Sequence, residues 1–434
     1  MIRQYFRFDE RGTNLRTEIT AGVTTFFTMA YILVVNPGIL SQGAGMDFGA
    51  VFLATALSAG ISSLLMGLIA NYPLALAPGM GLNAYFTYTV VGAMGVKWQV
   101  ALGAVFISGV LFLILTLTKV RELIIDAIPR GLKHAISAGI GLFIAFIGLK
   151  DAGIIVADKA TFVTLGHFND KSVLLTLFCL ALSLFFMVRK VRGGILLGMI
   201  ITSIVGMVTG IIQPPTAIVS APPSLAPTFL HLDVKGAMDL GLFTIVFAFL
   251  FVDFFDNAGT LVGVATKAGL LKDNKLRNAK RVFLTDSIAT IIGSLLGTST
   301  VTSYIESASG VAEGGRTGFA SVITAILFFL SIFFFPIVKS IAVSPAVTAP
   351  VLIIVGSLMV TSLKEIDWSD FTEAVPAFLT ILLMPLSFSI ATGIALGFIV
   401  YPFMKLFKGE ARNVHPIIYV LAVLFIARFV FISA

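Results

Sequence analysis

Long apolar runs dominate this sequence and limit what the chain can fold into. A helix of about 20 apolar residues is needed to cross the hydrocarbon core of a bilayer. Runs of about this length are 19–40, 50–70, 98–118, 131–149, 172–188, 195–212, 241–265, 282–297, 319–341, 346–363 and 414–433. Only 12% of the residues are charged, compared with about 25% in soluble domains. The sequence therefore predicts an all-α polytopic membrane protein.

Three further apolar stretches are interrupted. Residues 72–91 contain two prolines and two glycines, and residues 298–316 begin rich in serine and threonine and end rich in glycine. Proline and glycine disfavour the interior of a helix, so neither stretch should form an uninterrupted one. Residues 371–406 hold three prolines and predict two short helices in a hairpin near Ser387. The chain should then have about fourteen or fifteen membrane segments.

Lysine and arginine cluster in alternate connections between the apolar runs, as expected where those connections lie in the cytoplasm. The clusters are Arg3, Arg7, Arg11 and Arg16; Lys119, Arg121, Arg130 and Lys133; Arg189, Lys190 and Arg192; and Lys267, Lys272, Lys275, Arg277, Lys280 and Arg281. We expect a cytoplasmic N-terminus at 1–18, no cleaved signal peptide, and insertion into the cytoplasmic (inner) membrane. Topology also explains the net charge of +7 without a nucleic-acid partner. The run 414–433 remains after the other membrane segments have been counted. The side of the membrane on which the C-terminus lies therefore stays open.

The two halves of the chain resemble each other. Residues 51–65 align without gaps on 282–296, and shorter matches pair Asn36–Leu40 with Asn257–Leu261 and Gly194–Gly198 with Gly393–Gly397. These matches predict a first repeat at 19–235 and a second at 236–434. Repeats with an odd number of crossings must be inverted, and inverted repeats place a substrate near the membrane midplane between discontinuous helices. The interrupted stretches occupy corresponding positions, so we expect the site there.

Two carboxylates lie inside the apolar run 249–260. On a helix, Asp253, Asp256 and Thr260 share one face. An ionisable group at bilayer depth costs roughly 2.5–3.5 kcal/mol and usually faces a bundle interior or a water-filled cavity. A transport site is therefore the default interpretation, although Asp253 could instead be a structural residue bonded to a neighbouring helix.

The interrupted stretches add further candidates. The first offers Asn83, which could also be a simple helix cap, and the second offers Glu306 preceded by Tyr304. Phe26 is the aromatic candidate from the first run, whereas Tyr31 and Tyr85 are more typical of packing. Carboxylates, an amide and aromatic rings suit a flat, neutral, nitrogen-rich ligand.

The same carboxylates suggest proton coupling. Desolvation and a neighbouring acid raise the proton affinity of a carboxylate, so Asp256, Glu306 and Asp253 could take up a proton on one side and release it on the other. Sodium coupling stays open. No motif for ATP hydrolysis, metal binding or catalysis is present in the sequence. We therefore expect no enzyme activity, no metal and no cofactor other than the proton gradient.

Four stretches resemble a known family: Glu18–Pro37, Pro78–Phe86, Phe255–Leu261 and Tyr304–Gly310. They are similar to the nucleobase–cation symporter-2 superfamily, in its azaguanine-type branch of purine permeases. The resemblance implies the uracil-permease fold, with fourteen segments in two inverted repeats of seven. It also implies a core domain, here 19–118 with 241–341, and a gate domain, here 128–212 with 346–434.

In that family the substrate lies between two short antiparallel strands in segments 3 and 10. The resemblance assigns substrate and proton binding to Asp256 and Glu306, places Asn83 in the segment 3 motif, and makes Asp253 the second acid. It further implies an elevator-like movement of core against gate, and a homodimer through the gate.

The function we expect is import of a purine nucleobase by proton symport, with adenine first and hypoxanthine or guanine next. Two alternatives remain. One is an anion exchanger or channel of the same fold, for sulfate or bicarbonate, although Glu306 at the segment 10 break disfavours an anion. The other is a pyrimidine or xanthine permease.

Overall fold

The computed structural model describes the chain except for residues 1, 119–126, 239–242, 273–274 and 432–434. A few side chains inside the described elements, including that of Asp256, also lie outside the description. The described part is mostly helical, with three short two-stranded sheets. The prediction of an all-α membrane protein is confirmed.

The first half of the chain contains the following elements: α1 (Ile2–Phe6), α2 (Leu15–Met29), α3 (Ile32–Ala44), α4 (Phe48–Leu65), β1 (Leu76–Pro78), α5 (Met80–Ala84), α6 (Trp98–Leu117), α8 (Arg130–Asp151), β2 (Ile155–Asp158), β3 (Phe162–Leu165), α9 (Lys171–Val188), α10 (Gly194–Val208) and α11 (Val234–Ala237). Widened π-helical turns continue α4 over Met66–Ala70 and α5 over Tyr85–Ala93.

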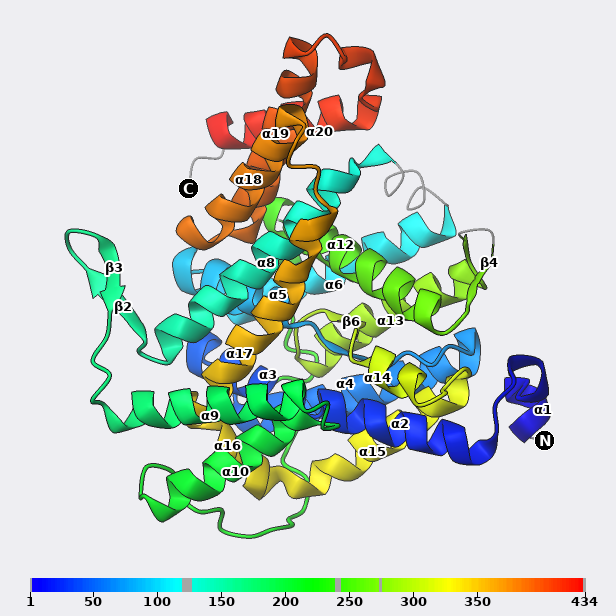
Figure 1. The fold of residues 1–434 in the computed structure, drawn as a ribbon, viewed down its shortest axis with the longest axis vertical. Coiled ribbons are helices and arrows are strands. Elements are labelled where there is room, and N and C mark those ends of the chain that lie inside the picture. Colours follow the sequence, from blue (N-terminus) through cyan, green and yellow to red (C-terminus); the bar gives the residue numbers. More distant parts are fainter. Residues whose placement is uncertain (1, 119–126, 239–242, 273–274, 432–434) are drawn as a thin grey trace.

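The second half contains α12 (Phe243–Lys267), β4 (Leu271–Lys272), β5 (Lys275–Leu276), α13 (Ala279–Leu296), β6 (Val301–Ser303), α14 (Ser307–Ala312), α15 (Gly318–Ser331), α16 (Phe335–Ala342), α17 (Pro345–Val360), α18 (Phe371–Leu386), α19 (Ile390–Phe407) and α20 (Pro416–Phe431). Figure 1 shows α1 and β4 at one side of the molecule and the β2–β3 hairpin at the opposite side. Two of the basic clusters expected in the cytoplasm, those at α1 and β4, therefore lie at the same side of the molecule.

Both interrupted stretches break as predicted, and their extended pieces pair with each other. β1 and β6 run antiparallel in the register Leu76↔Ser303, Ala77↔Thr302 and Pro78↔Val301. The pairing continues in a hydrogen bond from Gly79 N to Thr300 O at 2.9 Å. Extended backbone at membrane depth must find partners inside the protein. Each strand supplies these partners for the other, so the centre of the molecule is built from both halves of the sequence.

The first apolar run, 19–40, lies within one longer candidate span, Leu15–Ala44. It extends back to Leu15 and divides into α2 and α3 at Ala30–Tyr31. Pro37 lies inside α3, where it removes a backbone hydrogen bond and crowds the carbonyl one turn earlier. The carbonyl that Pro37 crowds is that of Leu33, within α3, so Pro37 does not account for the break at Ala30–Tyr31.

The C-terminal segments follow the prediction. The stretch 371–406 forms α18 and α19, with a short turn that contains Ser387. The remaining run forms a further helix, α20, which crosses α19 near the top of Figure 1. The Phe425 ring of α20 packs 5.5 Å from Phe247 of α12 and 6.0 Å from Phe398 of α19. Helix α20 therefore packs against α12 of the expected core and α19 of the expected gate.

Two groups of helices have most of their contacts internally. Helices α2, α3, α4, α6, α12, α13, α14 and α15 pack together around β1 and β6. Helix α8 packs on α17 and α18, and α9 packs on α10 and α17. The grouping resembles the expected core and gate, whose boundaries stay a prediction.

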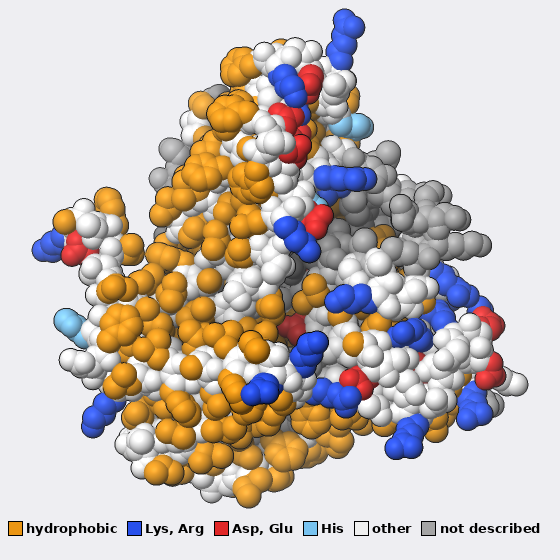
Figure 2. Space-filling view, in the orientation of Figure 1, with side chains coloured by type: hydrophobic (Ala, Val, Ile, Leu, Met, Phe, Trp, Pro, Cys, Tyr) orange, Lys and Arg blue, Asp and Glu red, His pale blue; other side chains and the backbone are white. Residues whose placement is uncertain are grey.

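The described surface carries the apolar character that a bilayer requires. Eight helices within the described residues are long and apolar enough to span a membrane. Figure 2 shows hydrophobic side chains over much of the visible face, with most lysine and arginine side chains toward the side that holds α1 and β4. The chain is an integral membrane protein.

A cluster of charges joins the ends of α18 and α19. Asp370 caps α18 through Thr372 N at 2.9 Å and accepts a hydrogen bond from Lys408 Nζ at 3.0 Å. The Lys408 ammonium, together with the Thr372 hydroxyl and N–H, holds the pKa of Asp370 well below its usual range. A lowered pKa in the folded state stabilises the fold at neutral pH, and this stabilisation is lost as the pH falls through that pKa.

We predict that Lys408→Met makes the purified protein less stable than wild type near neutral pH, by a small margin because the pair is partly exposed. The difference should shrink as the pH falls below about 4, because the Asp370 carboxylate then takes up a proton in the unfolded chain and, at still lower pH, in the folded chain. Thermal unfolding in detergent across an acidic pH series measures this. Lys364→Met, which removes an exposed lysine 3.8 Å from Glu365, is the matched control. Equal acid dependence in wild type and Lys408→Met would contradict the assignment.

Candidate functional site

Glu306 lies at the junction between β6 and α14. Its carboxylate accepts a hydrogen bond from the Tyr31 hydroxyl, which comes from the α2–α3 junction. Glu306 is half-buried. The preceding Ile305 is 55% exposed, whereas the three residues of β6 are buried. The carboxylate therefore lies at an accessible edge of the strand pair.

Close helix packing brings Glu306 to this position. A Cβ atom added to Gly310 of α14 would lie 2.5 Å from the Ala21 carbonyl oxygen of α2. Any larger side chain at Gly310 would separate the two helices. Glycine at this position lets α14 lie against α2, next to Tyr31.

Asn83 lies inside α5, directly after β1, and is fully buried. Its Oδ1 accepts a hydrogen bond from the Ser299 hydroxyl, whereas its Nδ2 has no partner among the described residues. Gly79, not Asn83, occupies the N-cap position of α5, so the helix-cap alternative is wrong. A buried donor without a partner costs about 1–3 kcal/mol, which a ligand acceptor could recover.

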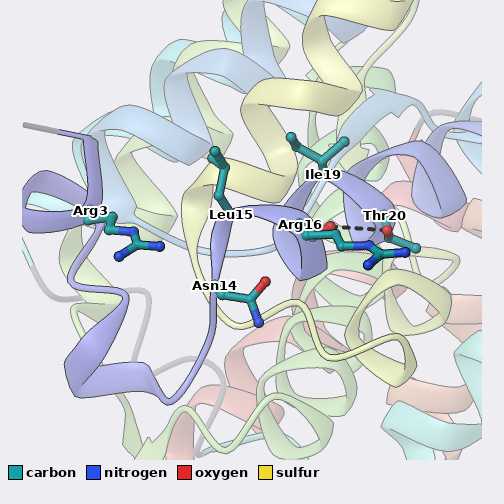
Figure 3. Close-up of a pocket in the computed structure, with 6 residues that line it drawn as sticks. All are labelled: Arg3, Asn14, Leu15, Arg16, Ile19 and Thr20. Atoms are coloured by element: carbon teal, nitrogen blue, oxygen red, sulfur yellow. Dashed lines mark hydrogen bonds between the residues drawn. The ribbon is translucent and has the colours of Figure 1, made fainter.

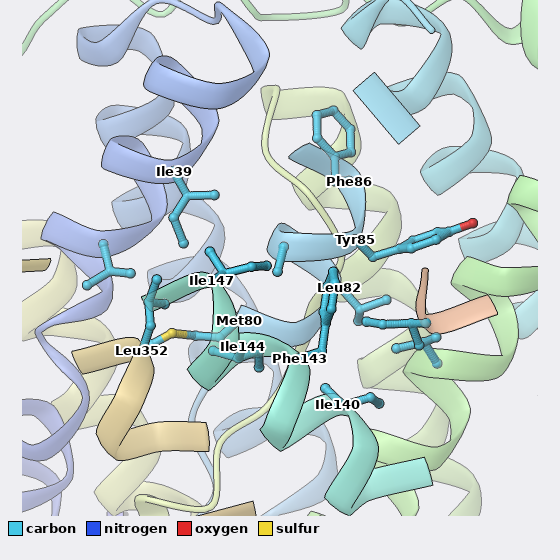
Figure 4. Packing of buried hydrophobic residues seen from close by; sticks show 14 of the residues in the cluster. Ile39, Met80, Leu82, Tyr85, Phe86, Ile140, Phe143, Ile144, Ile147 and Leu352 are labelled. Atoms are coloured by element: carbon cyan, nitrogen blue, oxygen red, sulfur yellow. The ribbon is translucent and has the colours of Figure 1, made fainter. Parts of the chain in front are cut away.

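An apolar wall holds α5 in place. Met80 lies between side chains of α8 and α17 (Figure 4), whereas the Tyr85 and Phe86 rings pack against Phe249 of α12, with centroids 5.0 and 6.3 Å away. A Cβ atom at Gly81 would lie 2.6 Å from Ile140 Cγ2 of α8. Glycine at this position therefore allows the close approach of α5 to α8.

The other candidate substrate-binding residues are Tyr304, Phe26 and Thr260. The Tyr304 hydroxyl donates to Pro78 O at 2.6 Å and thus links the two strands. The Phe26 ring is half-buried and packs edge-on against Phe328, with centroids 5.2 Å apart. Thr260 is buried on α12. The structure thus gives Tyr304 and Phe26 packing partners, and their contact with a substrate stays a prediction.

Helix α12 carries the two aspartates past the strand pair. It contacts β6, α14 and α5. Asp253 is buried, and its Oδ2 accepts a hydrogen bond from Thr290 Oγ1 of α13 at 3.3 Å. This contact joins Asp253 to a side chain of a neighbouring helix. Asp256 lies on the same helix, but its side chain is outside the described residues, so its predicted role stays a prediction.

Comparison with known proteins identifies the family. A family model described as a permease family matches residues 16–396. The chain belongs to the nucleobase–cation symporter-2 family. Because this is a family of transporters, the prediction that the chain is not an enzyme is confirmed.

Relatives that align with this nucleobase–cation symporter-2 permease over nearly their whole length are named after the substrates they transport. The guanine/hypoxanthine permease PbuG of Bacillus subtilis is 52% identical over 444 residues, which cover 100% of each chain. The adenine permease AdeP of Escherichia coli is 46% identical over 435 residues, which cover 100% of this chain and 97% of the relative. Among solved structures, the transmembrane domain of the cyanobacterial bicarbonate transporter BicA has a TM-score of 0.65 at 16% identity, over 88% of this chain and 97% of that one. The last likeness supports the fold alone.

Tyr31 is the residue that the sequence analysis missed in this permease. It was interpreted as a packing residue, yet its hydroxyl bonds the Glu306 carboxylate from 275 positions away along the chain. Its ring is buried in the main apolar cluster, as expected for packing. The available signal was a tyrosine in an apolar run shortly before Pro37.

Proposed function

We propose that this permease imports purine nucleobases together with protons across the cytoplasmic membrane. The observation that carries the proposal is the β1–β6 pair with Asn83 after one strand and Glu306 after the other. The amide of Asn83 and the carboxylate of Glu306 can bond the donors and acceptors on a purine edge. The full-length relatives named as guanine/hypoxanthine and adenine permeases support the same substrate class.

Glu306 is also our candidate proton carrier. It combines an ionisable carboxylate, partial burial and an accessible position at the strand edge. Desolvation favours its protonated form and contact with water favours its ionised form. Alternate exposure to the two sides of the membrane would therefore load and release a proton, with Asp256 and Asp253 as further candidates. The proton gradient would supply the energy.

We further propose that the core moves against the gate, with the N-terminus in the cytoplasm. Among the described residues, polar contacts join the two expected domains at both ends, and one of them is the Thr89 hydroxyl that donates to Phe388 O at 2.7 Å. At the end away from α1, the Tyr88 hydroxyl donates to Asp151 Oδ2 at 2.6 Å. At the basic end, Arg192 pairs with Glu313. Such contacts can break and re-form in each transport cycle.

The anion-exchanger alternative has less support. Its ligand would meet the Glu306 carboxylate at the centre of the site, and like charges at close range repel. The structural likeness to a bicarbonate transporter, at 16% identity, supports the fold and not the substrate.

The decisive experiment is uptake of radiolabelled adenine, hypoxanthine, guanine and uracil into bacteria that lack their own nucleobase carriers. We expect one or more purines to accumulate, and a protonophore to abolish the accumulation. Repeating the assay without sodium separates proton from sodium coupling. Failure of every purine to accumulate, with the protein present in the membrane, would refute the proposed substrate class.

Asn83→Ala should change which purine is preferred more than it changes the total capacity for uptake. The Asn83 Nδ2 group can donate to a ring nitrogen or an exocyclic oxygen, and losing one such bond costs about 0.5–1.5 kcal/mol. The ratio of adenine to hypoxanthine uptake is therefore expected to change up to about tenfold. Competition assays with unlabelled purines measure this ratio. Ser203→Ala, which removes a buried hydroxyl bonded within α10, is the control. An unchanged ratio in Asn83→Ala would remove Asn83 from the site.

A further inference from the structure

The Tyr31–Glu306 hydrogen bond joins two breaks in membrane segments. Tyr31 lies between α2 and α3, and Glu306 lies between β6 and α14. Tyr31 is 1% exposed, and its ring is held in the main apolar cluster. The hydroxyl is therefore presented to Glu306 by a rigid part of the fold.

Tyr31 is the single side chain among the described residues that donates a hydrogen bond to the Glu306 carboxylate. A carboxylate has about four acceptor positions. Most of them are left for a ligand, while the tyrosine hydroxyl orients the group. By contrast, the buried Glu18 carboxylate accepts bonds from the backbone N–H groups of Arg316, Thr317 and Ala320.

We propose that Tyr31 is a positioning residue that orients the Glu306 carboxylate and sets the pH at which this carboxylate exchanges its proton. The inference rests on the proposed function of Glu306 as proton carrier. A hydroxyl that donates to a carboxylate stabilises the ionised form relative to the protonated form. Tyr31 thereby opposes the effect of burial on this carboxylate.

Other ionisable groups on the elements packed around β6 and α14 have different neighbours. Tyr304 donates to Pro78 O, Asp253 accepts from Thr290, Glu18 accepts from the backbone at the start of α15, and Glu313 pairs with Arg192. Asp286 is buried on α13, and the Asp256 side chain on α12 lies outside the described residues. Within the described part, Tyr31 is thus the ionisable side chain in direct contact with the Glu306 carboxylate.

The test is the pH dependence of purine uptake by Tyr31→Phe, which removes the hydroxyl and keeps the ring. We expect uptake to fall about tenfold at neutral pH, and the pH of half-maximal uptake to rise by about one unit, because the carboxylate then holds its proton more tightly. Tyr401→Phe is the matched control, since the Tyr401 hydroxyl donates to Glu373 at 2.9 Å, away from the site. It should leave the midpoint unchanged.

A second measurement keeps the proposal testable if Tyr31→Phe is poorly expressed or folds less well than wild type. The purified variant is heated with and without purine over the same pH series, and the stabilisation by purine should show the same shift of midpoint. An unchanged midpoint in Tyr31→Phe, in a protein whose wild type accumulates purine with protons, would overturn the role of Tyr31 alone. Failure of the wild type to accumulate purine would instead refute the proposed function.

Discussion

Replacing Glu306 with glutamine is expected to lower purine uptake by about 100-fold or more, while the protein remains in the membrane. Glutamine keeps the size of the side chain but cannot carry the proton. It also replaces a charge-assisted hydrogen bond to the substrate, worth about 1.5–3 kcal/mol, by a weaker neutral one. Initial rates of radiolabelled uptake, normalised to the amount of protein in the membrane, measure the effect.

The controls for this prediction separate the site from general charge effects. Glu365→Gln neutralises an exposed carboxylate at the end of α17 and should transport like wild type. Asp256→Asn should behave like Glu306→Gln, as the family resemblance implies. Wild-type uptake in the double variant Asp256→Asn/Glu306→Gln would refute the mechanism, because both carboxylates proposed to bind the substrate would be neutral and only Asp253 would be left of the three proposed proton carriers.

Replacing Glu18 with alanine is expected to destabilise the protein by about 3 kcal/mol. The carboxylate is fully buried on α2, where Oε1 accepts from Arg316 N at 2.8 Å and Oε2 accepts from Ala320 N at 3.2 Å. These N–H groups lie at the start of α15, where the first turn of a helix has no internal acceptors. Alanine would remove the acceptor of Arg316 N and Thr317 N, at about 1–3 kcal/mol for each group, whereas Ala320 N can still donate to Thr317 O at 3.3 Å.

Thermal unfolding of the purified protein in detergent should show this loss as a clear fall in melting temperature. Glu18→Gln should lie between alanine and wild type, because the amide oxygen can still accept one of the bonds. Glu10→Gln is the matched control, since Glu10 is exposed and its nearest cation, Arg7, is 3.6 Å away. A melting temperature for Glu18→Ala equal to that of Glu10→Gln would contradict the capping role.

Sequence reasoning identified the breaks at 72–91 and 298–316, because proline, glycine and hydroxyl side chains act locally on backbone conformation. It also identified Asn83 and Glu306, since polar groups stand out in apolar surroundings. The same reasoning treated Tyr31 as a packing residue. It assigned Glu18 no role beyond the family motif, although this carboxylate reaches residues about 300 positions away.

The sequence by itself determined that the chain spans a membrane many times, that two of its segments are broken, and that carboxylates lie at membrane depth. These properties depend on the hydropathy and conformational preferences of neighbouring residues. Only the tertiary structure decided which donor meets these three acids: Tyr31 for Glu306, Thr290 for Asp253 and the start of α15 for Glu18. A buried polar group must find a partner wherever packing places one, and helix packing brings together residues from opposite halves of the chain.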